Sequence, residues 1–235
     1  MPKLDENQLK SLSVFANLNH VIVKQNVELL EAIVGFETKN KYIALDEVGR
    51  QLFSIAEESS CCFRQLCSSG RAYTMHVHDV NMGEVMIIQS PMRPCKGPLC
   101  FACCDLCSHQ NHVFCCQKEI GYIKEELTFV WYNFVVYKSD DMPAYTIKAP
   151  LCRWDCCCCE DVFQIYEYQG NVPIGKISKT FSGLAKEVFT DADLFGVQFP
   201  REIHVRDKAL LFAAIFLIEL MFYENNKTDP RKAMS

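Results

Sequence analysis

The chain has 235 residues, of which 49% are hydrophobic and 23% are charged. This composition is enough for one large domain or two small ones with a sizeable core. The formal net charge of −5 gives no support for nucleic acid as the main partner, because domains that bind nucleic acid are usually basic. Residues 1–17 are polar and charged and lack the apolar stretch of a secretory signal. We therefore expect a reducing compartment, in which the fifteen cysteines do not form a disulfide framework.

In chain order, the pattern predicts one short helix followed mostly by strands and turns. Residues 6–15 are expected to form the helix. Short stretches rich in β-branched and aromatic residues predict strands at 20–23, 37–43, 51–56, 73–79, 84–89, 127–137, 145–149 and 161–168. Gly49 and the 81–83 run mark two of the turns. No long amphipathic helix is expected before residue 180, so the fold class is mainly β.

A four-residue pattern occurs twice in the second half of the chain. Ile-Gly-Tyr-Ile at 120–123 is repeated as Ile-Gly-Lys-Ile at 174–177. Each copy is expected to open a strand after a turn. Both a duplicated β unit and chance remain open as explanations.

The apolar segment 208–223 is the strongest helix prediction. After Lys208 only Glu219 interrupts it. A helix of this length is about 24 Å long, whereas a membrane core is about 30 Å thick. A helix that is apolar on all faces is either a marginal membrane span or a buried core helix, and composition favours burial. The positions that mark this core or membrane helix are Lys208, Ala209, Phe212, Phe216, Glu219 and Phe222.

The cysteines fall into three groups and have three competing explanations. The groups are Cys61, Cys62 and Cys67; then Cys95, Cys100, Cys103, Cys104, Cys107, Cys115 and Cys116; and finally Cys152 with Cys156, Cys157, Cys158 and Cys159. Two Cys-x2-Cys spacings in the middle group, with His109 and His112 nearby, resemble zinc ligands. Buried cysteines can instead act as small hydrophobic residues.

Neighbouring exposed thiols also suit S-palmitoylation, since two acyl chains anchor a protein stably where one does not. A run of four adjacent cysteines fits simple burial poorly, because alternate residues of a strand face opposite sides. The candidate lipidation residues are Cys100, Cys103, Cys104 and Cys107.

An acidic segment near residue 191 partly matches an EF-hand calcium loop. With Asp191 at position 1, Asp193 falls at position 3, Gly196 at position 6 and Glu202 at position 12. Phe195, at position 5, carries no side-chain oxygen. Asp191, Asp193 and Glu202 are therefore candidate ligands of a weak calcium site, and a turn that binds nothing is the alternative.

Several ordered motifs resemble the phospholipid scramblase family over roughly residues 20–225. They are VELLE at 27–31, GFETKNKY at 35–42, the pair Cys61 and Cys62, GKISK at 175–179, FTDADLFGVQFP at 189–200 and the apolar segment 208–224. This resemblance implies a tubby-like fold, which is a closed antiparallel β barrel around a central hydrophobic C-terminal helix. We accordingly divide the chain into a short polar N-terminal segment (1–18), a scramblase or tubby-like domain (19–225) and a polar tail (226–235).

The resemblance also implies a function. Members of the family are associated with calcium-dependent, energy-independent lipid transport between the leaflets of the plasma membrane, without covalent chemistry. It implies Ca²⁺ bound at 191–202 and covalent palmitate near residues 100–107, with attachment at the cytoplasmic face. The expected partners are a phospholipid membrane and further copies of the chain. If 208–223 is the core helix, the monomer offers no obvious lipid path, so scrambling needs oligomers, an inserted conformation or another protein.

A regulatory protein is the alternative function. The family's nuclear-import stretch corresponds to 175–184, where Lys176 and Lys179 are the basic residues. In this alternative the unacylated chain enters the nucleus and binds partners or DNA, although nucleic acid is an unlikely partner for an acidic chain. WW or SH3 docking is not expected because no proline-rich stretch precedes the domain. An enzyme built on His76 and His78 has little support, because alternate strand residues commonly share an ordinary sheet face.

Some positions depart from the family pattern. The compact cysteine run is broken here, which weakens the assignment of any single acylated thiol. Leu194 stands where the family has Asn, so one candidate oxygen ligand is missing. The aromatic residue expected directly after the GKISK motif is displaced to Phe181.

Overall fold

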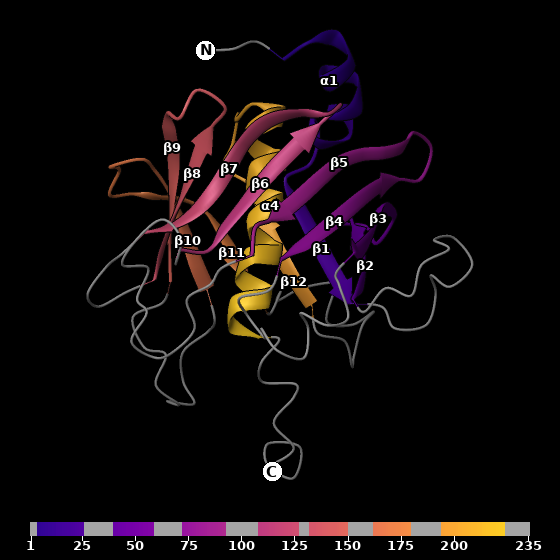
Figure 1. The fold of residues 1–235 in the computed structure, drawn as a ribbon. Coiled ribbons are helices and arrows are strands. Elements are labelled where there is room, and N and C mark those ends of the chain that lie inside the picture. The colour runs from indigo at the N-terminus through magenta and orange to yellow at the C-terminus, as the bar shows by residue number, and fades with distance from the viewer. Residues whose placement is uncertain are drawn as a thin grey trace, which may run out of the picture.

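The computed structural model describes residues 4–25, 40–58, 72–92, 108–126, 132–149, 162–179 and 194–223. Within these residues, twelve antiparallel strands close into one barrel around a C-terminal helix (Figure 1). The strands are β1 (His20–Gln25), β2 (Lys41–Leu45), β3 (Gln51–Glu58), β4 (Tyr73–Asp79), β5 (Gly83–Ser90), β6 (Gln110–Cys115), β7 (Lys118–Glu126), β8 (Asn133–Lys138), β9 (Pro143–Lys148), β10 (Val162–Glu167), β11 (Pro173–Ser178) and β12 (Leu194–Gln198). This confirms the predicted mainly β fold.

Each strand pairs with its neighbours in the chain, and β1 closes the barrel by pairing with β12. His20 lies opposite Gln198, and Lys24 lies opposite Leu194. Alternate residues point inward, as in β6, where Asn111, Val113 and Cys115 are buried. Closure removes the exposed sheet edges that would otherwise invite pairing with another chain.

The connections at the two ends of the barrel differ in length. Because neighbouring strands are antiparallel, every second connection lies at the same end. At one end, which we call the short-turn end, turns of two to five residues join β2–β3, β4–β5, β6–β7, β8–β9 and β10–β11. At the opposite end, which we call the long-connection end, the strands are joined by residues 26–40, 59–72, 91–109, 127–132, 149–161 and 179–193. The C-terminal helix, α4 (Val205–Phe222), begins at the short-turn end and finishes at the long-connection end.

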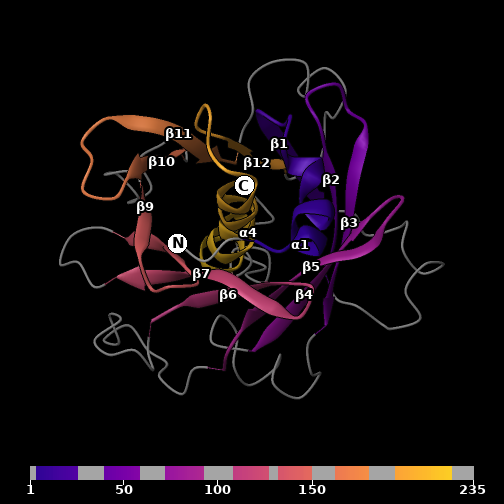
Figure 2. The ribbon, with the colours of Figure 1, turned by 90° about the horizontal axis from the view of Figure 1, so that it is seen from above.

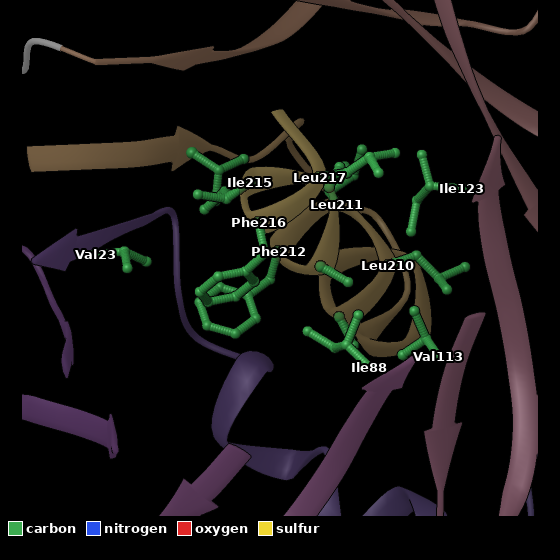
Figure 3. Close-up of a cluster of buried hydrophobic side chains, with 14 of the residues drawn as sticks. Val23, Ile88, Val113, Ile123, Leu210, Leu211, Phe212, Ile215, Phe216 and Leu217 are labelled. Atoms are coloured by element: carbon green, nitrogen blue, oxygen red, sulfur yellow. The ribbon is translucent and has the colours of Figure 1, made fainter. Parts of the chain in front are cut away.

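Helix α4 (Val205–Phe222) fills the centre of the barrel. Figure 2 shows it end-on, with the strands arranged around it. Of its residues, only Val205 and Met221 are not buried, which agrees with the prediction of a helix that is apolar on every side. Figure 3 shows Leu210, Leu211, Phe212 and Phe216 among inward side chains of the strands. The core-helix positions predicted from the sequence therefore lie inside the barrel.

No helix in the described part of the chain is both long enough and apolar enough to cross a membrane.

The N-terminal segment packs against the short-turn end. It forms α1 (Glu6–Ser11) and a 3₁₀ helix, η1 (Ser13–Phe15), as the sequence predicts for residues 6–15. Asp5 and Gln8 cap α1 reciprocally: Gln8 N–H donates to Asp5 Oδ1 and Asp5 N–H donates to Gln8 Oε1. The Phe15 ring is fully buried, 5.1 Å from the Phe53 ring and 5.6 Å from Phe212. This segment is thus attached to the barrel and its core.

Two strands were not predicted. The sequence of β6 mixes polar, histidine and cysteine residues, and the residues of β12 fall within the predicted calcium loop. β12 is apolar on both faces because Leu194 packs outside the barrel with Ile22 and Leu45, while Phe195 and Val197 face the core. The predicted strand at 37–43 begins at Lys41 among the described residues, and residues 37–39 lie outside them.

Candidate functional site

The two ends of α4 carry the polar groups that enter the barrel, and we take them as the candidate site. Near the long-connection end, Glu219 is 2% exposed, and its Oε2 accepts a 2.8 Å hydrogen bond from the Tyr42 hydroxyl. A buried carboxylate needs such donors because it has lost its water. Glu219, which interrupts the apolar sequence, is therefore accommodated inside the protein.

A second buried carboxylate lies at the same end of the barrel. Glu57, at the end of β3, is 1% exposed and accepts a 2.6 Å hydrogen bond from Asn40 Nδ2. Gln25 Nε2 in turn donates to Asn40 Oδ1 at 3.1 Å. A third carboxylate, Glu125 on β7, accepts from His109 Nδ1 at 2.6 Å. Three carboxylates, those of Glu219, Glu57 and Glu125, thus lie near the long-connection end, and each accepts a hydrogen bond.

The short-turn end contains the charged first turn of α4. Asp207 Oδ2 accepts from the Tyr145 hydroxyl at 3.1 Å and lies 3.7 Å from Lys138 Nζ. Burial, reinforced by the neighbouring Asp207 charge, raises the pKa of Tyr145. Lys208 Nζ donates to the carbonyl oxygens of Ala16 (2.9 Å) and Leu18 (2.7 Å), and burial lowers the pKa of Lys208. These contacts connect α4 to the N-terminal segment.

The predicted calcium residues are only partly described. Residues 194–198, at positions 4 to 8 of the predicted loop, form strand β12. An extended strand rises about 3.3 Å per residue, so the two ends of β12 are about 13 Å apart. Glu202 lies in an exposed turn beyond β12, with φ +58°. This stretch therefore does not adopt the compact EF-hand loop, and Asp191 and Asp193 lie outside the described residues.

Across the ranges that the structure describes, no group of three or more His, Cys, Asp or Glu side chains is arranged to hold a metal ion. The calcium site remains a prediction.

Comparison with known proteins identifies the family. A family model described as Scramblase matches residues 1–225. The chain belongs to the scramblase family. It is 34% identical to phospholipid scramblase 2 of Bos taurus over 224 residues, which cover 93% of this chain and 73% of the relative. It is also 34% identical to phospholipid scramblase 1 of Homo sapiens (94% and 68% covered) and 32% identical to phospholipid scramblase family member 5 of Homo sapiens (92% and 78% covered). No solved structure was found to match the chain.

The predicted lipidation residues of this scramblase-family chain lie outside the described residues. Cys100, Cys103, Cys104 and Cys107 belong to the connection between β5 and β6. The other two cysteine groups belong mainly to the connections β3–β4 and β9–β10. The strands that these three connections join are described, but the cysteines of the connections lie outside the described residues. Cys115 and Cys116, at the short-turn end, are described and are free thiols.

The predicted import residues lie on β11 and just beyond it. Lys176 is half-buried and pairs across the sheet with Gln164 and Gln198. Lys179 Nζ lies 4.9 Å from the centre of the Tyr223 ring at the end of α4, which is the geometry of a cation–π contact. Lys179 therefore lies at the long-connection end of the scramblase-family barrel, whereas Lys176 lies within β11, opposite the end of β12.

Sequence reasoning missed Tyr42, Glu57 and Lys138 as partners of buried polar groups. Each of the three is a polar residue within or at the end of a strand. Tyr42 pairs with Glu219 and Lys138 with Asp207, and both pairs join distant parts of the chain. Only a polar residue at an inward position of a predicted strand signals such a pair, and that signal does not name its partner.

Proposed function

We propose that this protein moves phospholipids between the two leaflets of a membrane, with neither an energy source nor covalent chemistry. The observation that carries the proposal is the family match over residues 1–225, together with relatives named phospholipid scramblases. The matched residues include all twelve strands of the barrel and helix α4. The proposed activity therefore belongs to the barrel as a whole.

The second part of the proposal concerns attachment at the cytoplasmic face of the plasma membrane. Helix α4 is packed inside the barrel, so we assign membrane attachment to acyl chains. Palmitate on two or more of Cys100, Cys103, Cys104 and Cys107 would give stable anchoring, since one chain binds only reversibly. These residues connect strands at the long-connection end, and acylation there would turn this end toward the lipid.

The third part concerns calcium. Asp191 and Asp193 are the proposed ligands, with backbone carbonyls and water completing the oxygen shell that Ca²⁺ prefers. Glu202 is a further candidate, although β12 separates it from the two aspartates in the chain. Calcium would add positive charge at the start of β12, at the same end as the proposed acyl chains, and would draw that end toward anionic headgroups.

The packed interior also bears on mechanism. A headgroup that crosses a bilayer needs a polar path through about 30 Å of hydrocarbon, whereas the barrel interior is occupied by α4 and its apolar neighbours. We therefore place the lipid path outside a single barrel interior, between copies of the chain or along its outer surface. An interaction between copies is part of the proposal for this reason.

The test is leaflet exchange of a labelled phospholipid in vesicles that contain the purified, acylated protein, with and without calcium. The proposal predicts calcium-dependent exchange above that of protein-free vesicles. The double change Asp191→Ala with Asp193→Ala should abolish the calcium response, and Asp140→Ala with Asp141→Ala, an acidic pair in the β8–β9 turn, is the matched control.

Exchange no faster than in protein-free vesicles would contradict the proposed transport of phospholipids. If the unmodified chain then accumulated in the nucleus when acylation is blocked, the regulatory alternative would be favoured instead.

A further inference from the structure

The β6–β7 turn brings two adjacent thiols together. Cys115 ends β6 and is 1% exposed, while Cys116 begins the turn and is exposed. Neighbouring side chains of an extended strand point to opposite faces. Here Cys116 and Gln117 have φ of +51° and +63°, and this left-handed turn directs the Cys116 thiol back toward its neighbour. The two Sγ atoms are 4.0 Å apart.

The N-terminal helix covers this turn and contributes a third polar atom. Ser11 Oγ lies 3.5 Å from Cys116 Sγ. Gln8 Nε2 donates to the Cys115 carbonyl oxygen at 3.3 Å, and Lys118 Nζ lies 2.8 Å from Asp5 Oδ2. Two anchoring contacts therefore hold α1 in place, so that one hydroxyl and two sulfurs converge from distant parts of the chain.

We propose that Cys115 and Cys116 form a two-sulfur binding site for a soft metal cation such as Zn²⁺, with the Ser11 hydroxyl and water completing the coordination. Two sulfurs bound to a tetrahedral zinc ion at about 2.3 Å lie about 3.8 Å from each other. The observed 4.0 Å already matches this spacing. The two sulfurs are in contact at 4.0 Å, whereas a disulfide would hold them at about 2.05 Å.

Binding exchanges protons for metal. Each thiol gives its proton to water and forms one sulfur–metal bond, so one Zn²⁺ releases two protons and no electron is transferred. Burial, followed by the charge of the adjacent Cys116, raises the pKa of Cys115 to about 12. Zinc must therefore displace a tightly held proton, and its affinity should increase with pH.

Differential alkylation of the reduced, full-length protein tests the site among fifteen cysteines. The protein is alkylated with iodoacetamide at increasing zinc concentration, and chymotryptic cleavage after Phe114 and Tyr122 isolates residues 115–122, which contain only these two cysteines. At free zinc about ten times the dissociation constant, alkylation of Cys116 should slow by about tenfold, and EDTA should restore it. An unchanged rate up to millimolar zinc would overturn the proposal.

Variants and a second probe make the result specific. Cys116→Ser should remove the protection of Cys115, and Ser11→Ala should weaken protection, whereas the exposed control Lys10→Ala should leave it unchanged. Phenylarsine oxide, which takes two thiols on one arsenic with loss of water, should bridge Cys115 and Cys116 within the 115–122 peptide. A peptide with an arsenic on neither thiol, or with a disulfide in the untreated reduced protein, would count against the site.

Discussion

At the scale of single residues, the polar side chains beside α4 show how an apolar barrel tolerates charge. Glu219 is held by Tyr42 and Glu57 by Asn40, and Lys208 donates to two backbone carbonyls. A buried hydrogen bond adds only about 1 kcal/mol to stability, but a buried group that loses its partner costs about 1–3 kcal/mol. These pairs therefore fix the position of α4 more than they strengthen the core.

Tyr42→Phe tests this view of Glu219. The change removes one oxygen and leaves the packing of the ring on Phe216, 5.4 Å away, nearly intact. Because the carboxylate loses the Tyr42 donor, we expect the free energy of unfolding to fall by about 1–3 kcal/mol, measured by denaturant unfolding. Tyr122→Phe, whose hydroxyl donates to Asp141 in an exposed place, is the control and should cost less than Tyr42→Phe. Equal costs for the two variants would contradict the argument.

His76 gives a prediction about pH. Burial lowers its pKa, but hydrogen bonds to Glu84 (2.6 Å) and Glu58 (3.2 Å) outweigh burial and raise the pKa overall. A raised pKa in the folded state means that His76 stabilises the protein fully below its unfolded pKa of about 6.5. This contribution is lost as the pH rises through the folded pKa. The site is partly exposed, so the effect should be below about 1 kcal/mol.

The measurement is the thermal midpoint of the wild type and of His76→Gln at pH 6 and at pH 8. The advantage of the wild type should be larger at pH 6. An advantage that stays constant, or grows, toward pH 8 would show that the two carboxylates do not hold the imidazolium.

At the scale of strands and helices, the repeated Ile-Gly-x-Ile pattern has a structural reason. A Cβ on Gly121 in β7 would lie 2.3 Å from the Tyr137 carbonyl oxygen and 3.0 Å from Leu210 of α4. A Cβ on Gly175 in β11 would lie 2.6 Å from the Gln198 carbonyl oxygen. Both glycines thus allow a neighbouring strand to come close, a role typical of glycine inside strands. The sequence showed the repeat but not the shared role.

Gly121→Ala should therefore destabilise the barrel severely, by about 3 kcal/mol or more, because a backbone carbonyl cannot move away cheaply. Gly83→Ala is the matched control: Gly83 has φ +78° but open space around it, so only a conformational cost of about 1–2 kcal/mol is expected. Chemical denaturation of both variants gives the comparison. A Gly121→Ala variant as stable as Gly83→Ala would contradict the close approach.

The N-terminal segment gives a prediction about one element's attachment. Lys208→Met removes both hydrogen bonds to the carbonyls of Ala16 and Leu18 while keeping the apolar stem. Hydrogen exchange of residues 12–18 should accelerate, and exchange in β7 and β8 should change little, because the loss is local. The exposed Lys10→Met is the control. If residues 12–18 exchanged at the wild-type rate, Lys208 would not hold this segment.

At the scale of the whole molecule, the sequence allows the composition of the fold to be predicted more readily than its closure. Alternating strands and an all-apolar helix are local patterns, and both were predicted. The pairing of β1 with β12 joins residues such as Val21 and Val197. These residues are far apart in the sequence, and no local sequence pattern encodes such a contact. Because acidic residues precede Leu194, the sequence also predicted a calcium loop that includes residues 194–198, but these residues form strand β12.

The candidate site was predictable to a similar extent. The residues of α4 were recognised because hydrophobicity alone marks them, and their enclosure on all sides followed from the absence of a polar face. The partners Tyr42 and Lys138 were not recognised, since each comes from a strand far from α4 in the chain. The two ends of the barrel became distinct only once alternating short and long connections were seen together.

The central claim is that this scramblase-family protein acts on phospholipids while α4 remains the core of the barrel. The most direct measurement is labelling by a phospholipid that carries a photoreactive group in its acyl chain, with the active protein in vesicles and the adducts mapped by mass spectrometry. The account predicts no adducts on residues 205–222. Adducts on Phe212, Phe216 or Leu217 would show that α4 meets the hydrocarbon of the bilayer and would contradict it.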